Sequence, residues 1–121
     1  MSITLIVEAL DTEAMRYLSV IPEGVGTCLA SSMYDALETL SDYRCSSVII
    51  TEEMALQENG PRSFETTLLF LETLHKNRYA GKVYVLVPDE SFVPLIAERF
   101  SLLAGVYLKE WFFNGEIALE F

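Results

Sequence analysis

The feature that most constrains the fold is a repeated alternation of short β-rich apolar runs with segments of helical periodicity. The first run, residues 3–9 (ITLIVEA), is apolar at five of seven positions, which is typical of a strand covered on both faces. The later runs are residues 25–30 (VGTCLA), 46–51 (SSVIIT), 82–87 (KVYVLV) and 105–108 (GVYL). Strands that alternate with helices form a parallel sheet with right-handed crossovers, so the pattern predicts a doubly wound α/β domain with five parallel strands.

Helical patterns follow each of these runs. Asp11 or Thr12 is predicted to cap the first helix, and Ser31 with Ser32 to cap the second. The third helix is predicted over residues 64–77 after an irregular stretch, 52–63, and the fourth begins near Ser91. The fifth, within residues 112–121, is interrupted by Gly115 and should be short or frayed. The residues predicted to face inward are Ala14, Tyr17, Leu18 and Ile21; Met33, Ala36, Leu37 and Leu40; Leu68, Leu71 and Leu74; and Val93, Ile96, Ala97 and Phe100.

Composition limits the partners. With 51% hydrophobic and 21% charged residues, residues 1–121 are expected to form one domain with a substantial core. The net charge of -10 repels nucleic acid phosphates and anionic lipids, so a protein partner is predicted, without nucleic acid or membrane insertion. The chain is expected to be cytoplasmic, because no apolar run approaches the ~20 residues of a membrane span and no basic signal-peptide region begins it. Cys28 and Cys45, in or beside strands, are expected to be free thiols.

Candidate functional residues lie at the carboxyl ends of the strands, where parallel α/β sheets place their sites. They are Glu8 and Asp11; Thr51, Glu52 and Glu53; Val87, Pro88, Asp89 and Glu90; and Lys109. The acids suit Mg²⁺ or Ca²⁺ if they converge, whereas separate positions would make them solvated loop residues. Lys109 is expected to form a structural salt bridge with Glu8, Glu52 or Asp89 rather than to act in catalysis.

Sequence signatures of catalysis are missing. His75 is the only histidine and lies near the end of a predicted helix, so a Ser-His-Asp, Cys-His or zinc site would have to be built around it alone. The two cysteines lack CxxC spacing, and no glycine-rich phosphate loop follows the first strand. We therefore predict neither enzymatic activity nor a cofactor.

Two short motifs resemble those of receiver domains of two-component response regulators. Thr51 ends an apolar run and has Met54 three residues on, where receivers have a phospho-accepting Asp and a Met at that spacing. The string Gly105-Val106-Tyr107-Leu108-Lys109 is similar to the strand that carries the invariant lysine of that family. The resemblance covers nearly the whole chain as a pattern and implies the flavodoxin-like (CheY-like) strand order 2-1-3-4-5.

Most other residues of a receiver site differ. Phosphorylation needs a carboxylate nucleophile and adjacent acids that hold Mg²⁺, and Thr51 supplies no carboxylate. Either Glu8 or Asp11 matches one of the two consecutive acids of the family, but no register supplies both. Val87 stands where the family has Thr or Ser, Val106 where it usually has the aromatic switch residue, and Glu110 where it has Pro. A slip of one residue would place Glu52 at the acceptor position as a phosphomimic, although the Met54 spacing argues against it.

The resemblance thus implies a pseudo-receiver, a phosphorylation-independent regulatory domain of bacterial two-component or phosphorelay signalling. Residues 49–56 (IITEEMAL) also resemble a segment of degenerate receiver-like domains at the N-terminus of some hybrid sensor histidine kinases. The implied partner is a kinase or output domain, or a second copy of the chain. Receivers usually bind through the surface of the fourth helix, fifth strand and fifth helix, where this chain has Phe92, Tyr107, Trp111, Phe112 and Phe113. Three consecutive aromatics cannot all point inward from one helix, so at least one should be exposed.

Two other hypotheses remain open at this point. One is a small α/β enzyme or ligand-binding domain that uses the acidic edge and Lys109 with a divalent metal. The other is an unconventional receiver in which Glu52 acts as a fixed mimic of phosphorylation.

Overall fold

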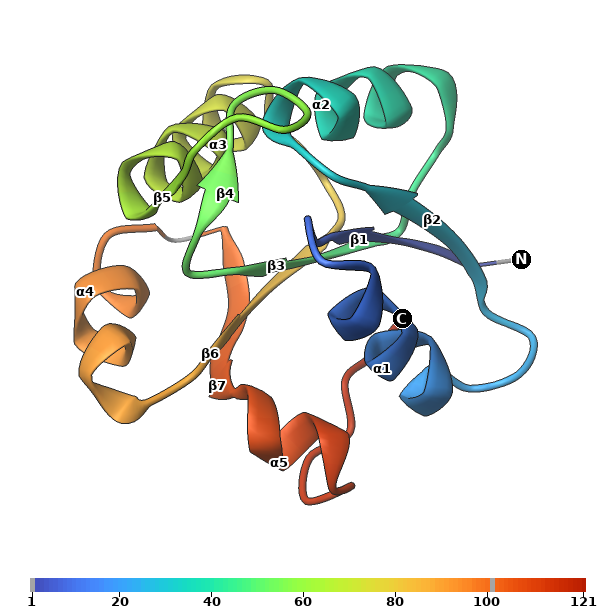
Figure 1. The fold of residues 1–121 in the computed structure, drawn as a ribbon. Coiled ribbons are helices and arrows are strands. Elements are labelled where there is room, and N and C mark those ends of the chain that lie inside the picture. Colours follow the sequence, from blue (N-terminus) through green and yellow to red (C-terminus); the bar gives the residue numbers. More distant parts are fainter. Residues whose placement is uncertain (1, 101) are drawn as a thin grey trace.

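A five-stranded parallel sheet organises the computed structural model, which describes residues 2–100 and 102–121 (Figure 1). Its strand order, β2-β1-β3-β6-β7, is the predicted order once the small β4-β5 hairpin is left out of the count. The main strands are β1 (Ile3–Val7), β2 (Gly26–Ala30), β3 (Ser47–Thr51), β6 (Lys82–Val87) and β7 (Leu103–Leu108). The helices are α1 (Asp11–Val20), α2 (Met33–Asp42), α3 (Phe64–Lys76), η1 (Glu90–Phe92), α4 (Val93–Ala97) and α5 (Lys109–Phe113).

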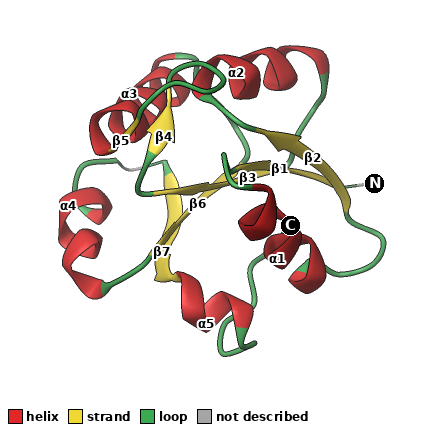
Figure 2. Ribbon diagram, viewed as in Figure 1, coloured by secondary structure: helices red, strands yellow, loops and turns green. Residues whose placement is uncertain are grey.

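Helices cover both faces of the sheet, as Figure 2 shows. Successive strand residues point to opposite faces, so Leu5 and Val7 face one layer while Ile6 faces the other. The larger core lies under α2, α3 and α4 and includes Leu71, whereas the second lies under α1 and α5 and includes Tyr17. The predicted inward residues of α1 and α2 are confirmed as buried or partly buried. In α3, Leu71 and Leu74 are confirmed as core residues, and Phe70 joins them although its position was not predicted.

Residues 52–63 are not wholly irregular, which corrects the prediction for this stretch. The two-residue strands β4 (Met54–Ala55) and β5 (Arg62–Ser63) pair antiparallel as a small hairpin. Its turn uses Asn59 with φ 62° and a hydrogen bond from the Gly60 N–H to the Gln57 carbonyl. Met54 and Ala55 are buried, which holds the hairpin beside the sheet.

The predicted start of α1 was wrong by one or two residues. The N-cap is Leu10, in extended conformation and without a side-chain cap, and Asp11 is already the first helical residue. The acids Asp11 and Glu13 in the first turn still suit the positive end of the helix dipole. By contrast, Ser32 caps α2 as predicted, because its hydroxyl accepts the Asp35 N–H at 3.2 Å.

The last two helices are shorter than predicted. After η1, α4 ends at Ala97, which is exposed rather than inward, and Phe100 lies beyond the helix. A helix over residues 112–121 does not form. Instead α5 spans Lys109–Phe113, and the chain then reverses at Gly115, whose φ of 81° disfavours any other residue. Strand β7 begins at Leu103, two residues earlier than predicted.

Two further expectations concern the chain as a whole. Cys28 and Cys45 are free thiols in the structure, and burial raises the pKa of the Cys45 thiol. Across residues 2–100 and 102–121, none of the helices combines the length and apolar character that a membrane crossing requires.

Candidate functional site

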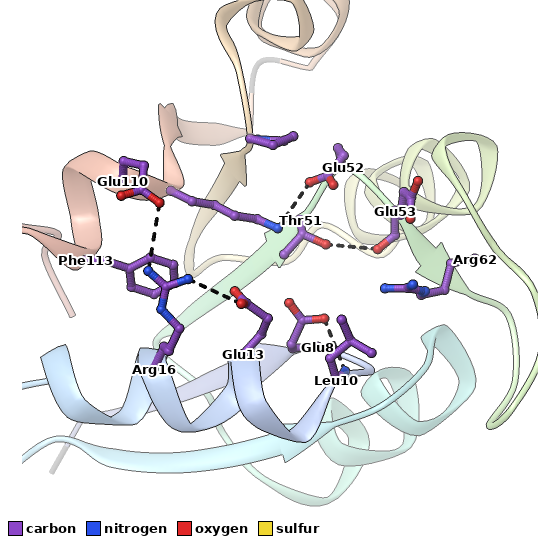
Figure 3. A pocket seen from close by; sticks show the side chains of 12 residues that line it. Glu8, Leu10, Glu13, Arg16, Thr51, Glu52, Glu53, Arg62, Glu110 and Phe113 are labelled. Atoms are coloured by element: carbon purple, nitrogen blue, oxygen red, sulfur yellow. Dashed lines mark hydrogen bonds and ion pairs between the residues drawn. The ribbon is translucent and has the colours of Figure 1, made fainter.

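The carboxyl ends of β1, β3 and β7, together with the start of α1, enclose a pocket of ≈ 360 Å³ (Figure 3). Parallel strands bring their carboxyl ends to one edge of the sheet, which is why residues far apart in sequence meet there. Of the predicted residues, the pocket unites Glu8, Thr51, Glu52, Glu53, Pro88 and Lys109. It also contains residues that were not predicted as part of the site: Leu10, Glu13, Arg16, Arg62, Glu110 and Phe113.

Thr51 is the last residue of β3, a strand that is buried over its whole length. Its hydroxyl donates a hydrogen bond to the Glu53 carbonyl at 2.9 Å. Its own carbonyl accepts the Thr67 hydroxyl of α3 at 3.1 Å, which ties the strand end to that helix. The Thr51 hydroxyl therefore serves a local turn, and its side chain is only 4% exposed.

Glu52 and Lys109 form the central ion pair of the pocket, with 3.6 Å between the Lys109 Nζ and the Glu52 Oε2. Lys109 is the first residue of α5 rather than the last of β7, so its side chain reaches back from the helix start. The two side chains are only 18% and 13% exposed, and the Glu52 Oε2 has no hydrogen-bond partner in the described part of the chain. Attraction between opposite charges in a weakly screened environment therefore holds the pair. Of the three acids predicted to pair with Lys109, Glu52 is the one that does.

Glu8 directly follows β1 and is partly buried at the pocket wall. Burial raises the pKa of its carboxyl, while the Leu10 N–H and the charge of Lys109 oppose that increase. The Leu10 N–H lies 3.4 Å from the Glu8 Oε2, which is a long hydrogen bond. The ionised form of Glu8 is therefore less stable here than in water, because burial removes part of its solvation.

Arg16 links α1 to α5 at the pocket rim and was missed by the sequence analysis. Its guanidinium lies 3.3 Å from Glu13, 3.9 Å from Glu110 and 4.0 Å above the ring centre of Phe113 (Figure 3). The spacing of Glu13 and Arg16, three residues apart on a helix, predicts their pairing. Nothing local predicts the contacts with α5, because those depend on how the two helices pack.

Several predicted residues lie outside this pocket. Asp11 is exposed and lines a neighbouring hollow with Ala55, Glu58 and Arg62. Val87 is fully buried in the core, and Asp89 caps η1 by accepting the Ser91 N–H at 2.9 Å. Glu90 is exposed on η1. Within residues 2–100 and 102–121, no group of three or more His, Cys, Asp or Glu side chains is arranged to hold a metal ion.

The aromatic residues predicted as an interface divide into two groups. Phe112 is only 2% exposed and packs beside Tyr17 in the core, so its assignment to the interface is corrected. Phe113 is partly buried between Tyr17 and Arg16. Phe92 is partly buried against Phe64, and Tyr107 against Tyr84. Trp111 is 37% exposed, which confirms that one member of the aromatic triplet reaches solvent.

No family model and no curated protein matches this chain. Solved structures do. The signal receiver domain of an HD domain-containing protein from Pseudomonas fluorescens is 16% identical, with a TM-score of 0.74 over 95% of this chain and 87% of that one. A Francisella response regulator receiver domain is 14% identical, with a TM-score of 0.71 over 97% and 91% of the two chains. The chain has the receiver fold.

A third structure with this fold adds a ligand-bound example. A response regulator protein from Thermotoga maritima, solved in complex with Mg²⁺ and BeF, is 16% identical, with a TM-score of 0.67 over 96% of this chain and 93% of that one. The observed strand order is the one that the resemblance to receiver domains implied.

The buried pair gives the first testable prediction. Replacing Lys109 with Met leaves the Glu52 carboxylate shielded from water without its cation, so the free energy of unfolding should fall by about 1–3 kcal/mol, less than for a fully buried pair. The double variant Lys109→Met/Glu52→Gln should recover most of that loss. Urea denaturation of the wild type, both single variants and the double variant measures the coupling. Additive effects of the two substitutions would show that the pair contributes nothing.

The raised pKa of Glu8 predicts a pH dependence. The folded protein holds the Glu8 proton more tightly than the unfolded chain, so stability falls as the pH rises from the ordinary value of 4.5 through the raised pKa. Glu8→Gln removes that loss. The variant should therefore gain stability relative to the wild type at about pH 7 and not at about pH 4, as measured by urea denaturation at both values. An equal difference at the two pH values would contradict the prediction.

Proposed function

We propose that this chain is a phosphorylation-independent pseudo-receiver of two-component-type signal transduction that acts through protein–protein contacts and not as an enzyme. The receiver fold supports the signalling role. The proposal that phosphorylation is lost rests on Thr51. This residue ends the central strand β3, at the position where the resemblance places the phospho-accepting Asp.

The chemistry of the pocket supports this proposal. An acyl phosphate requires a carboxylate nucleophile, and the Thr51 hydroxyl is instead engaged as a donor to the Glu53 carbonyl. Lys109, the residue that matches the family lysine, is paired with Glu52. Val87 supplies no hydroxyl that could respond to a phosphoryl group.

The surface of α4, β7 and α5 is the proposed contact area for a kinase or output domain, or for a second copy. Trp111 is its exposed aromatic residue, and large aromatics that are partly exposed are frequent anchors of protein interfaces. Phe92, at the end of η1 directly before α4, and Tyr107, on β7, are partly buried and would add apolar area to this surface.

Incubation with acetyl phosphate and Mg²⁺ tests the central point. We expect no hydroxylamine-sensitive phosphate on the chain, as measured by intact-protein mass spectrometry, while a receiver with an acceptor Asp is labelled under the same conditions. Thr51→Asp serves as an internal comparison, because it restores the nucleophile without supplying the second acid. An acyl phosphate on the wild-type chain would overturn the proposal.

A second function is favoured by one observation: the Glu52 carboxylate contacts Lys109, so a fixed negative charge already faces the family lysine. Glu52 would then act as a permanent phosphomimic. The two functions differ in what Glu52 does for binding, and therefore one pair of substitutions separates them.

Binding is measured through a fluorescent label on the partner, because Trp111, the only tryptophan in the chain, is itself replaced. In titrations with candidate kinase and output domains, we expect Trp111→Ala to weaken binding by about 2 kcal/mol, the threshold of an interface hot spot. Tyr43→Ala, at an exposed aromatic far from α5 in the chain, is the matched control. Glu52→Gln should leave affinity unchanged. Loss of binding in Glu52→Gln with full binding in Trp111→Ala would support the phosphomimic instead.

A further inference from the structure

Residues 116–121, here called the strap, cover the sheet face that α5 is too short to cover. After the reversal at Gly115, the strap runs beside α1, and Figure 1 shows its end next to that helix. Apolar residues alternate with exposed ones along it: Ile117, Leu119 and Phe121 pack against the core under α1, while Glu116, Ala118 and Glu120 are exposed. An alternation with a period of two residues is typical of an extended segment, although the strap pairs with none of the strands in the described part of the chain.

A few specific contacts hold the strap. At its start, the N–H groups of Glu116 and Ile117 donate to the Trp111 carbonyl at 2.9 and 3.2 Å. Near its end, the Tyr84 hydroxyl donates to the Glu120 carbonyl at 2.9 Å and lies 3.1 Å from the Glu120 N–H, which donates to it. The Glu120 carboxylate pairs with Lys82.

The surface beneath the strap is here called the groove. The apolar strap residues share one core cluster with Ile6, Ile49, Tyr84 and Leu86, which belong to three different strands. The Tyr84 hydroxyl forms hydrogen bonds with the backbone of the bound segment, and Lys82 pairs with an acid that lies between two apolar residues. The occupant seen here thus defines the pattern that fits: apolar, any, apolar, acidic, apolar.

The side-chain contacts that hold the strap to the rest of the domain are few and partly exposed. Leu119 is its one buried side chain, at 9% exposure, and the other two apolar residues are only partly covered. The Lys82–Glu120 pair is exposed on both sides and is weak for that reason. Gly115, in an exposed turn with open space around its Cα, can serve as a hinge.

We propose that this groove is a docking site for an extended segment of a protein partner, with apolar residues at alternate positions and an acidic residue before the last, and that the strap covers the groove until such a segment displaces it. The proposal deepens the protein-binding part of the proposed function and uses a surface separate from Trp111. As a tethered competitor, the strap acts at an effective concentration in the millimolar range, so a free segment binds weakly unless the strap is loosened.

The test uses the full chain and a fluorescein-labelled peptide with the strap sequence EIALEF, followed by fluorescence anisotropy. Glu120→Lys replaces the attraction to Lys82 by repulsion in cis and leaves the groove intact, and Leu119→Ala removes the buried anchor. Both variants should bind the peptide at least about tenfold more tightly than the wild type, since they weaken the cis competitor. Glu116→Lys is the control, because it makes the same charge change at an exposed residue that has no ion pair within the described residues. A peptide of scrambled sequence should not bind.

Hydrogen exchange of the wild type provides a second readout that does not depend on the variants. If the strap opens locally, the Glu120 amide exchanges on the order of a hundredfold faster than the amides of β6. Exchange of Glu120 at the rate of β6, or equal peptide affinity in the wild type, Glu120→Lys and Leu119→Ala, would overturn the proposal. Neither result bears on the acetyl phosphate experiment, so the strap proposal and the loss of phosphorylation fail independently.

Discussion

The burial of β1, β3 and β6 on both faces is the constraint on which the rest of the structure depends. Strands β3 and β6 are buried at nearly every position, and β1 at all but its first. Such strands need helices on both sides, and right-handed crossovers then place every strand in the same direction. The carboxyl ends therefore meet at one edge. The packing of the core therefore places Glu52 and Lys109 in one pocket, whatever chemistry their side chains carry out.

Core periodicity explains which parts of the fold were predictable from sequence. The strand over residues 82–87 was predicted with its observed bounds, because a continuous apolar run bounded by turn residues leaves few alternatives. The start of α2 was also predictable, since Ser32 caps it through its own side chain. The start of α1 was not, because Leu10 caps it without a side-chain hydrogen bond and no local residue type marks that arrangement.

The site was less predictable than the fold, for a physical reason. Glu8, Thr51 and Lys109 could be placed because each follows a strand, and strand ends share an edge. The choice of Glu52 as the partner of Lys109, and the contacts of Arg16 with Glu110 and Phe113, depend on the packing of α5 against α1. That packing follows from the early end of α5 and the reversal at Gly115. The sequence of residues 112–121 indicated the break at Gly115, but it did not indicate the direction that the chain takes after this residue.

Helix α5 connects the remaining features of the molecule. It begins with Lys109, which is paired in the pocket, and Arg16 holds its Glu110 and Phe113 from α1. Within the same short helix Trp111 is exposed, and its carbonyl accepts the hydrogen bonds that fix the start of the strap. Because all these contacts act on a helix of five residues, its orientation cannot change without disturbing the pocket, the α1 contact and the strap together. On the proposed function, the contacts of Arg16 with Glu110 and Phe113 thus have a structural use: they hold α5 and the surface around Trp111 in one orientation, to which a partner can bind without any phosphoryl group.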